Sequence, residues 1–248
     1  MTTFVLVPGF WLGGWAWSDV TARLRAAGHA VYPVTLTGLG ERVHLSSPHV
    51  DLDTHITDIV NTLAYEDLHE IVLVGHSYAG VVITGVADRL PERIARLIYV
   101  DTAPLPDGVA QADFGPPEVR RQYEQRVAEP GDGWRLALPS WEELDQGGNL
   151  DGLDQAARAR MRGRATDQPL RTSLQPLRLS NPARAQLPKT AIWCTFSSAQ
   201  VREIIASGAP LFSELAGPEW QFIDLPTGHW PMFSRPADLA ALLLDAVS

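Results

Sequence analysis

VLVGHSYAG, residues 72–80, is the stretch that decides the fold of this chain. Its apolar first half is typical of a strand buried on both faces, and the small residues after Ser77 are typical of the start of a helix. Gly75 and Ala79 stand two positions either side of Ser77, where a tight strand-to-helix turn leaves no room for larger side chains. Such a turn strains the backbone and holds the serine hydroxyl out of the sheet at a helix N-terminus. We therefore interpret Ser77 as a candidate nucleophile, with a helix-capping serine as the alternative.

Apolar, β-rich runs like the one before Ser77 recur along the whole chain. They do not alternate strictly between apolar and polar residues, which is typical of parallel strands covered by helices on both faces. Between them lie helical patterns, of which the first has a plausible N-cap at Ser18 and the second begins at Thr54. This order predicts an α/β fold that is doubly wound, with a mainly parallel sheet of about six to eight strands. The expected strands are residues 4–8, 30–36, 70–76, 96–101, 190–196 and 220–226, and the expected helices are residues 18–28, 54–66 and 236–247.

One segment departs from this alternation and is interpreted as an insertion. Residues 104–186 contain frequent Pro and Gly, no convincing strand, and short helical pieces such as residues 153–163. We expect a small, mostly helical cap over the carboxyl edge of the sheet, with residues 1–103 and 187–248 forming the α/β core. The alternative is a long disordered linker, which the apolar residues of the segment make less favourable. These residues are Trp134, Leu136, Trp141, Leu150 and Met161.

Composition and charge bound the class of protein. The chain has 248 residues, 45% of them hydrophobic, which is enough for one sizeable core. A formal charge of −9 argues against nucleic acid or an anionic membrane surface as a partner, because both need clustered cations. We expect a small-molecule substrate instead, and we keep a homodimer open.

The N-terminus and the cysteine content bear on location and on metal binding. MTTFVLVPGFW lacks the basic and long apolar segments of a secretion signal, and no run approaches the roughly 20 apolar residues that a membrane-spanning helix needs. Cys194 is the single cysteine, so neither an internal disulfide nor a site of paired thiolates is expected. A reducing, cytoplasmic location fits these features, and no metal or other cofactor is implied.

A serine hydroxyl needs a base, and seven histidines are available. His229, in LPTGHWPMF, lies just after the last expected strand, where the chain order Ser, acid, His puts the base on such a scaffold. His76 adjoins Ser77 on the buried side of the turn and is interpreted as a packing or hydrogen-bonding residue. Three further histidines have neither the HExxH spacing nor the pair spacings of zinc sites, and we interpret them as loop residues. They are His44, His49 and His55.

The loop after the first expected strand is a candidate for binding an oxyanion. In VPGFWLGGW, residues 7–15, Gly9 lets the backbone turn beneath Ser77 so that the amide of Phe10 faces it. The amide of Tyr78, at the start of the helix, is the other expected donor. Packing of the loop's tryptophans is an alternative role for the same stretch. The loop has neither the GKS or GKT of a phosphate loop nor a GxGxxG motif.

Taken together, five segments resemble the α/β-hydrolase superfamily, and within it the small-capped branch that includes bacterial esterases, plant salicylate methyl esterases and hydroxynitrile lyases. The resemblance covers nearly the whole chain. It implies that Ser77 is the nucleophile, that His229 is the base, and that the amides of Phe10 and Tyr78 form the oxyanion hole. Many relatives place Asp or Glu shortly after the strand that corresponds to TAIWCTF, where this chain has Phe196. The segments are VPGFWLGGWAW, TLTGLGER, GHSYAG, LIYVDTAPLPDG and LPTGHWPMF.

Another position offers the missing carboxylate. Asp101 ends the fourth expected strand, at the same carboxyl edge of the sheet as Ser77 and His229. Some superfamily members, among them lipases and a fungal-toxin lactonase, resemble this arrangement by taking their acid from that strand. A carboxylate there would accept the second imidazole N–H and stabilise the imidazolium. A cap or turn residue is the alternative role for Asp101, and Glu203 and Asp224 are weaker candidates for the acid.

These features predict a serine hydrolase that cleaves a carboxylic ester or lactone of a small apolar substrate through an acyl-enzyme on Ser77. One alternative is a lyase or cyclase that uses the same base and oxyanion hole without an acyl-enzyme. Another is a non-catalytic binding module, because a fold alone does not determine a function. We expect tryptophans to form an apolar substrate pocket, namely Trp11, Trp134, Trp141 and Trp230.

Overall fold

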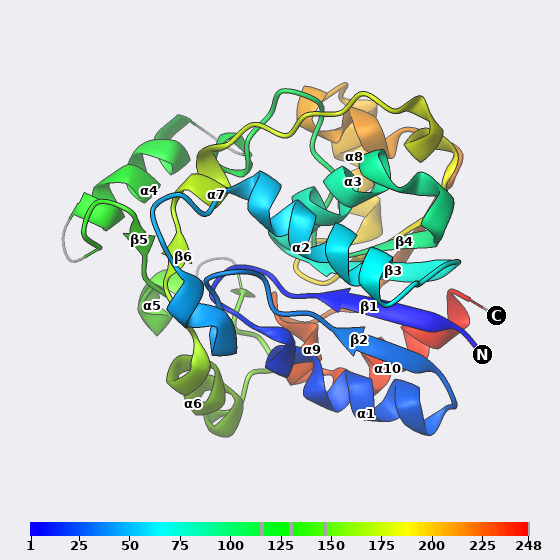
Figure 1. The fold of residues 1–248 in the computed structure, drawn as a ribbon, viewed down its shortest axis with the longest axis horizontal. Helices are drawn as coiled ribbons and strands as arrows, with labels where there is room; N and C mark the ends of the chain where they lie inside the picture. The colour runs from blue at the N-terminus through cyan, green and yellow to red at the C-terminus, as the bar shows by residue number, and fades with distance from the viewer. Residues whose placement is uncertain (115–116, 129–130, 146–147, 248) are drawn as a thin grey trace.

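A parallel sheet forms the centre of the molecule (Figure 1). The computed structural model describes residues 1–114, 117–128, 131–145 and 148–247. Its six-stranded sheet has the order β2-β1-β3-β4-β7-β8, and every neighbouring pair is parallel. The strands are β1 (Thr3–Val7), β2 (Ala30–Pro33), β3 (Ile71–His76), β4 (Ile94–Val100), β7 (Lys189–Trp193) and β8 (Trp220–Asp224). The prediction of a doubly wound α/β fold with these strands is confirmed.

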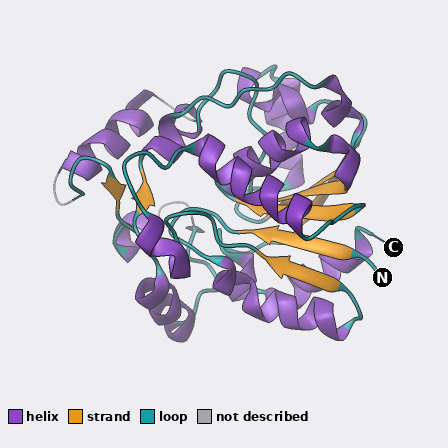
Figure 2. Ribbon diagram, in the orientation of Figure 1, coloured by secondary structure: helices purple, strands orange, loops and turns teal. Residues whose placement is uncertain are grey.

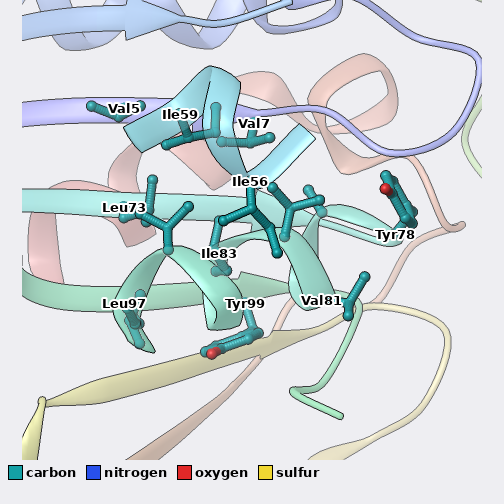
Figure 3. Close-up of a cluster of buried hydrophobic side chains, with 14 of the residues drawn as sticks. Val5, Val7, Ile56, Ile59, Leu73, Tyr78, Val81, Ile83, Leu97 and Tyr99 are labelled. Carbon is teal, nitrogen blue, oxygen red and sulfur yellow. The ribbon is translucent and has the colours of Figure 1, made fainter. Parts of the chain in front are cut away.

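Helices cover both faces of the sheet, and each face has its own hydrophobic cluster. Helices α1 (Ser18–Ala26) and α10 (Pro236–Asp245) lie on one face, and helices α2, α3 and α8 lie on the other (Figure 1). Successive side chains of β1 point to opposite faces, so Phe4 packs in the cluster of α1 and Val5 in the cluster of α2. Figure 3 shows the cluster on the side of α2, with Ile59 of α2 close to β1. The helices of this face are α2 (Leu52–Tyr65), α3 (Ala79–Arg89) and α8 (Ser198–Ala206).

Two predicted helix starts need correction. Helix α2 begins at Leu52 rather than at Thr54, and Asp51 caps it by accepting a hydrogen bond from the Thr54 amide at 3.0 Å. Thr54 is the third residue of the helix, and its hydroxyl completes a capping box with Asp51. In α1, the N-cap position falls on Trp17 and no side chain caps the helix, so Ser18 is the first helical residue and not the cap.

The part of the segment 104–186 from α4 to α6 lies at the end of the sheet to which the strand arrows point, and its longest elements are helices (Figures 1 and 2). Most of its described apolar side chains are packed rather than exposed, which is incompatible with a disordered linker in the described part. Three of these side chains are fully or nearly buried, namely Leu136, Leu150 and Met161. Residues 115–116, 129–130 and 146–147 of this segment lie outside the described residues. Its helices are α4 (Pro117–Ala128), α5 (Trp141–Leu144), α6 (Gln155–Arg164) and α7 (Arg171–Leu174).

Two short strands also lie in this segment, although its sequence contains no convincing strand. Strands β5 (Arg135–Leu136) and β6 (Gln168–Pro169) pair antiparallel. With two residues each, they are too short to produce a period-two pattern. Pro169 in addition lacks the amide that a regular strand residue donates. Only the tertiary structure brings these residues together.

Short helices connect the remaining elements. They are η1 (Gly14–Trp17), η2 (Gly40–Leu45), η3 (Pro91–Arg93), η4 (Gln111–Asp113), η6 (Pro182–Gln186), η7 (Pro210–Leu215) and α9 (Pro231–Ser234). In the described part of the chain, no helix combines the length and the apolar character needed to cross a membrane.

Candidate active site

Ser77 lies at the sharp turn between β3 and α3. Its φ of 54° is in the left-handed region, which is strained for a residue with a side chain. The turn leaves no room beside it, since a Cβ added to Gly75 would lie 2.8 Å from the carbonyl oxygen of Ala79. The hydroxyl of Ser77 is thereby held at the carboxyl edge of the sheet, at the start of α3.

His229 approaches Ser77 from the loop between β8 and α9. Its Nε2 is 2.8 Å from Oγ of Ser77, and its Nδ1 is 2.6 Å from Oδ2 of Asp101. Because an ionised carboxylate only accepts hydrogen bonds, Nδ1 of His229 carries a proton and donates to Asp101. Nε2 then accepts a hydrogen bond from the Ser77 hydroxyl. The three side chains form one continuous hydrogen-bonded chain.

Among the three candidate carboxylates, Asp101 is the one that the structure brings to His229. Asp224 instead accepts hydrogen bonds from the amide and the hydroxyl of Ser198, at 2.6 and 2.9 Å. Glu203 lies exposed on α8. The side chain of Asp101 is only 2% exposed and contacts the imidazole, which an ordinary turn residue would not do.

Polar groups from the end of β7 hold the carboxylate of Asp101. Its Oδ1 accepts hydrogen bonds from the amides of Cys194 and Thr195 at 2.9 and 3.0 Å, and Oγ1 of Thr195 donates to the same carboxylate. Burial by itself raises the pKa of Asp101, but the hydrogen bond and charge of His229 and the two amides outweigh burial and lower the pKa below its ordinary value. Sequence patterns did not identify Thr195, and its place directly before Phe196, at a strand end, is the signal that points to it.

The loop after β1 lies directly against Ser77. A Cβ added to Gly9 would lie 2.8 Å from Cβ of Ser77, so only glycine fits at this position. The rings of Phe10 and Tyr78 stack with their centroids 4.6 Å apart. Within the described part of the chain, the amides of Phe10 and Tyr78 donate no hydrogen bond to another group. Both amides therefore stay free for an oxyanion formed at Ser77.

His76 is fully buried behind the site. Its Nε2 donates a hydrogen bond to the carbonyl oxygen of His229 at 2.6 Å, in agreement with the hydrogen-bonding role expected from the sequence. Burial, together with the nearby charge of His229, lowers the pKa of His76 to about 3, so the ring is neutral at pH 7. A neutral ring at this position does not repel His229 when His229 becomes protonated.

His55 is not a loop residue, contrary to the interpretation of its sequence. It is fully buried in α2, with Nδ1 3.0 Å from the Tyr78 hydroxyl oxygen and Nε2 2.9 Å from the carbonyl oxygen of Thr37. These partners come from distant parts of the chain, so the local sequence carries no signal for them. His44 lies in the short helix η2, whereas His49 is in a loop. Among the described residues, no group of three or more His, Cys, Asp or Glu side chains could hold a metal ion.

A cavity of about 420 Å³ opens at Ser77 and His229. Phe196, which stands where many relatives carry the acid, is 54% exposed and forms part of the cavity wall. Apart from Asp101 and His229, none of the described side chains that line the cavity is ionisable. Most of the lining is apolar and includes Leu105, Trp193, Val201, Ile204, Leu211 and Phe212. The site is thus a mostly apolar pocket with a minority of polar groups in its wall.

The four tryptophans predicted to form the pocket do not line this cavity. Trp230 is 3% exposed and packs in the core on the side of α1. Trp11 donates its indole N–H to the carbonyl oxygen of Leu136 at 2.9 Å. Trp134 and Trp141 lie under the guanidinium groups of nearby arginines. These four indole rings hold parts of the chain together, and the pocket is instead lined by Trp193 and by apolar side chains that include those of α8 and η7.

Similarity to known proteins extends over nearly the whole chain. A family model described as the alpha/beta hydrolase family matches residues 4–242. The chain is 36% identical to the carbendazim hydrolyzing esterase of Nocardioides sp. (strain SG-4G), over 98% of each chain. It is 26% identical to methyl jasmonate esterase 1 of Vitis vinifera, over 98% of this chain and 96% of the relative. Among solved structures, an extracellular alpha/beta-hydrolase from a Paenibacillus species has a TM-score of 0.80 at 26% identity, over 99% of each chain.

Proposed function

We propose that Ser77 forms an acyl-enzyme in the mechanism of this chain. The chain belongs to the alpha/beta hydrolase family and is an ester hydrolase. One observation carries the proposal. Oγ of Ser77 lies 2.8 Å from Nε2 of His229, and Nδ1 of His229 lies 2.6 Å from Oδ2 of Asp101. This chain of contacts supports the roles of nucleophile, base and orienting acid that ester cleavage through an acyl-enzyme requires.

In the acylation step, Oγ of Ser77 attacks the carbonyl carbon of the ester while its proton passes to Nε2 of His229. The oxyanion that forms accepts hydrogen bonds from the amides of Phe10 and Tyr78. Asp101 stays ionised and stabilises the imidazolium. When the tetrahedral intermediate collapses, the bond to the alcohol oxygen breaks and His229 gives its proton to that oxygen. The alcohol leaves, and the acyl group remains on Ser77.

Deacylation repeats these steps with water as the nucleophile. His229 takes a proton from the water molecule, and the water oxygen attacks the acyl carbon. The same two amides bind the second oxyanion. Collapse of this intermediate breaks the bond to Oγ of Ser77, which recovers its proton from His229 as the carboxylic acid leaves.

The cavity beside Ser77 supports a small, uncharged and fairly apolar substrate. Its volume of about 420 Å³ falls toward the lower end of the range for pockets that bind small molecules. Its wall supplies no cationic or anionic partner besides His229 and Asp101 among the described lining residues. A charged substituent would therefore lose hydration without gaining an ion pair. A carboxylic ester or lactone with an apolar acyl or alcohol portion matches this lining.

Intact-protein mass spectrometry tests the acyl-enzyme. After brief treatment with a fluorophosphonate, we expect one adduct on the wild type and none on Ser77→Ala. With a nitrophenyl ester, the wild type should release nitrophenol beyond one equivalent. Asp224→Asn is the matched control, because its carboxylate contacts Ser198 and not the site, and it should behave as the wild type does. Folded wild-type protein without an adduct would contradict the proposal and favour chemistry without an acyl-enzyme, as in a lyase or cyclase.

A further inference from the structure

Buried polar side chains support both sides of the proposed oxyanion hole. Gln168 and Thr172 are both fully buried. The side-chain oxygen of Gln168 accepts a hydrogen bond from the Trp11 amide at 3.2 Å, and its Nε2 donates to Oγ1 of Thr172 at 2.8 Å. Thr172 in turn donates its hydroxyl proton to the carbonyl oxygen of Pro169 at 2.6 Å. This chain therefore holds the residue that follows Phe10.

His55, in α2, supports the other side of the oxyanion hole through Tyr78. The carbonyl oxygen of Thr37 only accepts hydrogen bonds, so Nε2 of His55, 2.9 Å away, carries the ring proton. Nδ1 is then an acceptor and receives a hydrogen bond from the Tyr78 hydroxyl at 3.0 Å. Burial lowers the pKa of His55 to about 4, which keeps the neutral ring at pH 7. Figure 3 shows Tyr78 at the edge of its cluster of apolar side chains. His55 is the hydrogen-bond partner of its hydroxyl.

Trp11 has a backbone conformation that needs support. Its φ of 66° lies in the left-handed region, which costs about 1–3 kcal/mol for a residue other than glycine. Besides the bond from its amide to Gln168, its carbonyl oxygen accepts from the Thr166 amide at 3.0 Å, and its indole donates to the carbonyl oxygen of Leu136 at 2.9 Å. The Trp11 amide belongs to the same planar peptide unit as the Phe10 carbonyl, so these contacts restrict the orientation of the Phe10 backbone.

We propose that Gln168, Thr172 and His55 are positioning residues for the oxyanion hole. Through their hydrogen bonds, they hold the amides of Phe10 and Tyr78 in the orientation that an oxyanion needs. The proposal rests on the proposed function, because it requires an oxyanion to form in this site. The three residues do not line the substrate cavity, so they act through their neighbours and not on the substrate itself. Removing the hydrogen bonds of these residues should weaken transition-state binding and leave ground-state binding nearly unchanged.

A pair of ketones separates these two kinds of binding. With an aryl trifluoromethyl ketone, Oγ of Ser77 bonds to the carbonyl carbon, the serine proton passes to His229, and the ketone oxygen becomes an oxyanion facing the amides. The corresponding aryl methyl ketone is not activated toward addition and binds as an intact carbonyl compound. The ratio of the two inhibition constants therefore reports on the oxyanion hole.

Two substitutions delete hydrogen bonds of the chain and nearly keep the side-chain volume, namely Gln168→Met and Thr172→Val. We expect each to lower kcat by on the order of 10- to 100-fold and to weaken the trifluoromethyl ketone by a similar factor. KM and the affinity for the methyl ketone should stay within about twofold of the wild type. Thr172→Ser keeps the hydroxyl and should restore wild-type behaviour.

Thr84→Val is the matched control for these variants. It deletes a buried threonine hydroxyl, whose Oγ1 lies 3.0 Å from the hydroxyl of Tyr99, without touching the hydrogen bonds of Gln168, Thr172 or His55. It should leave both inhibition constants unchanged. Gln168→Met and Thr172→Val proteins that lose stability alone, with wild-type kcat and trifluoromethyl ketone affinity, would overturn the proposal.

The same experiment separates this proposal from the one on which it rests. A wild type that binds the trifluoromethyl ketone no more tightly than the methyl ketone would contradict the acyl-enzyme mechanism itself. Tight wild-type binding that the substitutions do not weaken would contradict only the positioning role. If Gln168→Met does not fold, the comparison of Thr172→Val with Thr172→Ser gives the same decision.

Discussion

Asp101 and His229 are 128 residues apart in the sequence, yet Oδ2 of one lies 2.6 Å from Nδ1 of the other. They follow β4 and β8, which β7 separates in the sheet. The end of β7 lies between the two strands and holds the Asp101 carboxylate through the amides of Cys194 and Thr195. The strand between β4 and β8 thus supplies the groups that hold the carboxylate proposed as the acid.

Asp101→Asn tests the orienting role of this carboxylate. A neutral amide does not stabilise the imidazolium, and its NH₂ group favours the wrong tautomer of His229. We expect kcat for a nitrophenyl ester to fall by on the order of 10⁴-fold in a folded protein. Circular dichroism establishes the folded state, and Asp224→Asn, measured in parallel, should keep its turnover. An Asp101→Asn enzyme with wild-type turnover would remove Asp101 from the mechanism.

Thr195→Val tests whether the hydroxyl group that contacts Asp101 contributes to turnover and to stability. The substitution removes the hydroxyl that donates to both carboxylate oxygens of Asp101 and keeps the amide contact. We expect a several-fold lower kcat, far short of the effect of Asp101→Asn, and a free energy of unfolding lower by about 1–3 kcal/mol. Steady-state kinetics and urea unfolding measure these two quantities. Ser197→Ala, which removes the cap of α8 without touching Asp101, is the control for stability loss alone.

Gly9→Ala tests the contact between the oxyanion loop and the nucleophile. The added Cβ would lie 2.8 Å from Cβ of Ser77 and 3.0 Å from Nδ1 of His76, so the loop must move away from the site. We expect kcat to fall by at least on the order of 10²-fold, as for the loss of an oxyanion donor. Gly163→Ala, in α6 with no atom within 4 Å of the added Cβ, should keep full activity and gain about 0.5–1 kcal/mol of stability. Equal activity of the two variants would contradict the proposed loop position.

The buried histidines predict how stability depends on pH. The folded-state pKa of His55 is lowered from 6.5 to about 4, so the unfolded chain takes up the proton first as the pH falls. Stability is therefore lost on acidification between about pH 6.5 and 4, by about 1.4 kcal/mol per pH unit for each such histidine. His55→Gln should reduce this slope in urea unfolding measured from pH 7 to 4.5. Parallel curves for the variant and the wild type would mean that His55 is not held neutral in the fold.

Phe196→Asp tests the position where many relatives carry the acid. Phe196 forms part of the cavity wall, and Asp101 already contacts His229, so a second carboxylate is not required. We expect the wild type to be active and the variant to have no higher kcat, with a higher KM for apolar esters because the wall becomes charged. Steady-state kinetics with esters of increasing chain length measure both effects. A chain that hydrolyses esters only after this substitution would show that Asp101 does not serve as the acid.

The sequence by itself determined those features that depend on residues close together along the chain. A buried apolar run predicts its own strand, and the six strands lie where their runs indicated. The turn at Ser77 follows from small residues within a few positions, and the loop at Gly9 follows from its own glycine. The two predicted helix starts that needed correction concern one or two positions each, because capping depends on side-chain geometry that residue type only suggests.

Only the tertiary structure decided which distant residues meet. Asp101, Glu203 and Asp224 were all compatible with the order of the chain, and strand packing selected one of them. Trp134 and Trp141 were expected in the pocket because they lie in the cap, and Trp230 because it follows His229, whereas in the fold they pack elsewhere. The hydrogen bonds of Gln168 to Trp11 and Thr172 have no sequence signal at all. These contacts join residues far apart along the chain, and no local spacing encodes the distance between two side chains that only the folded sheet brings together.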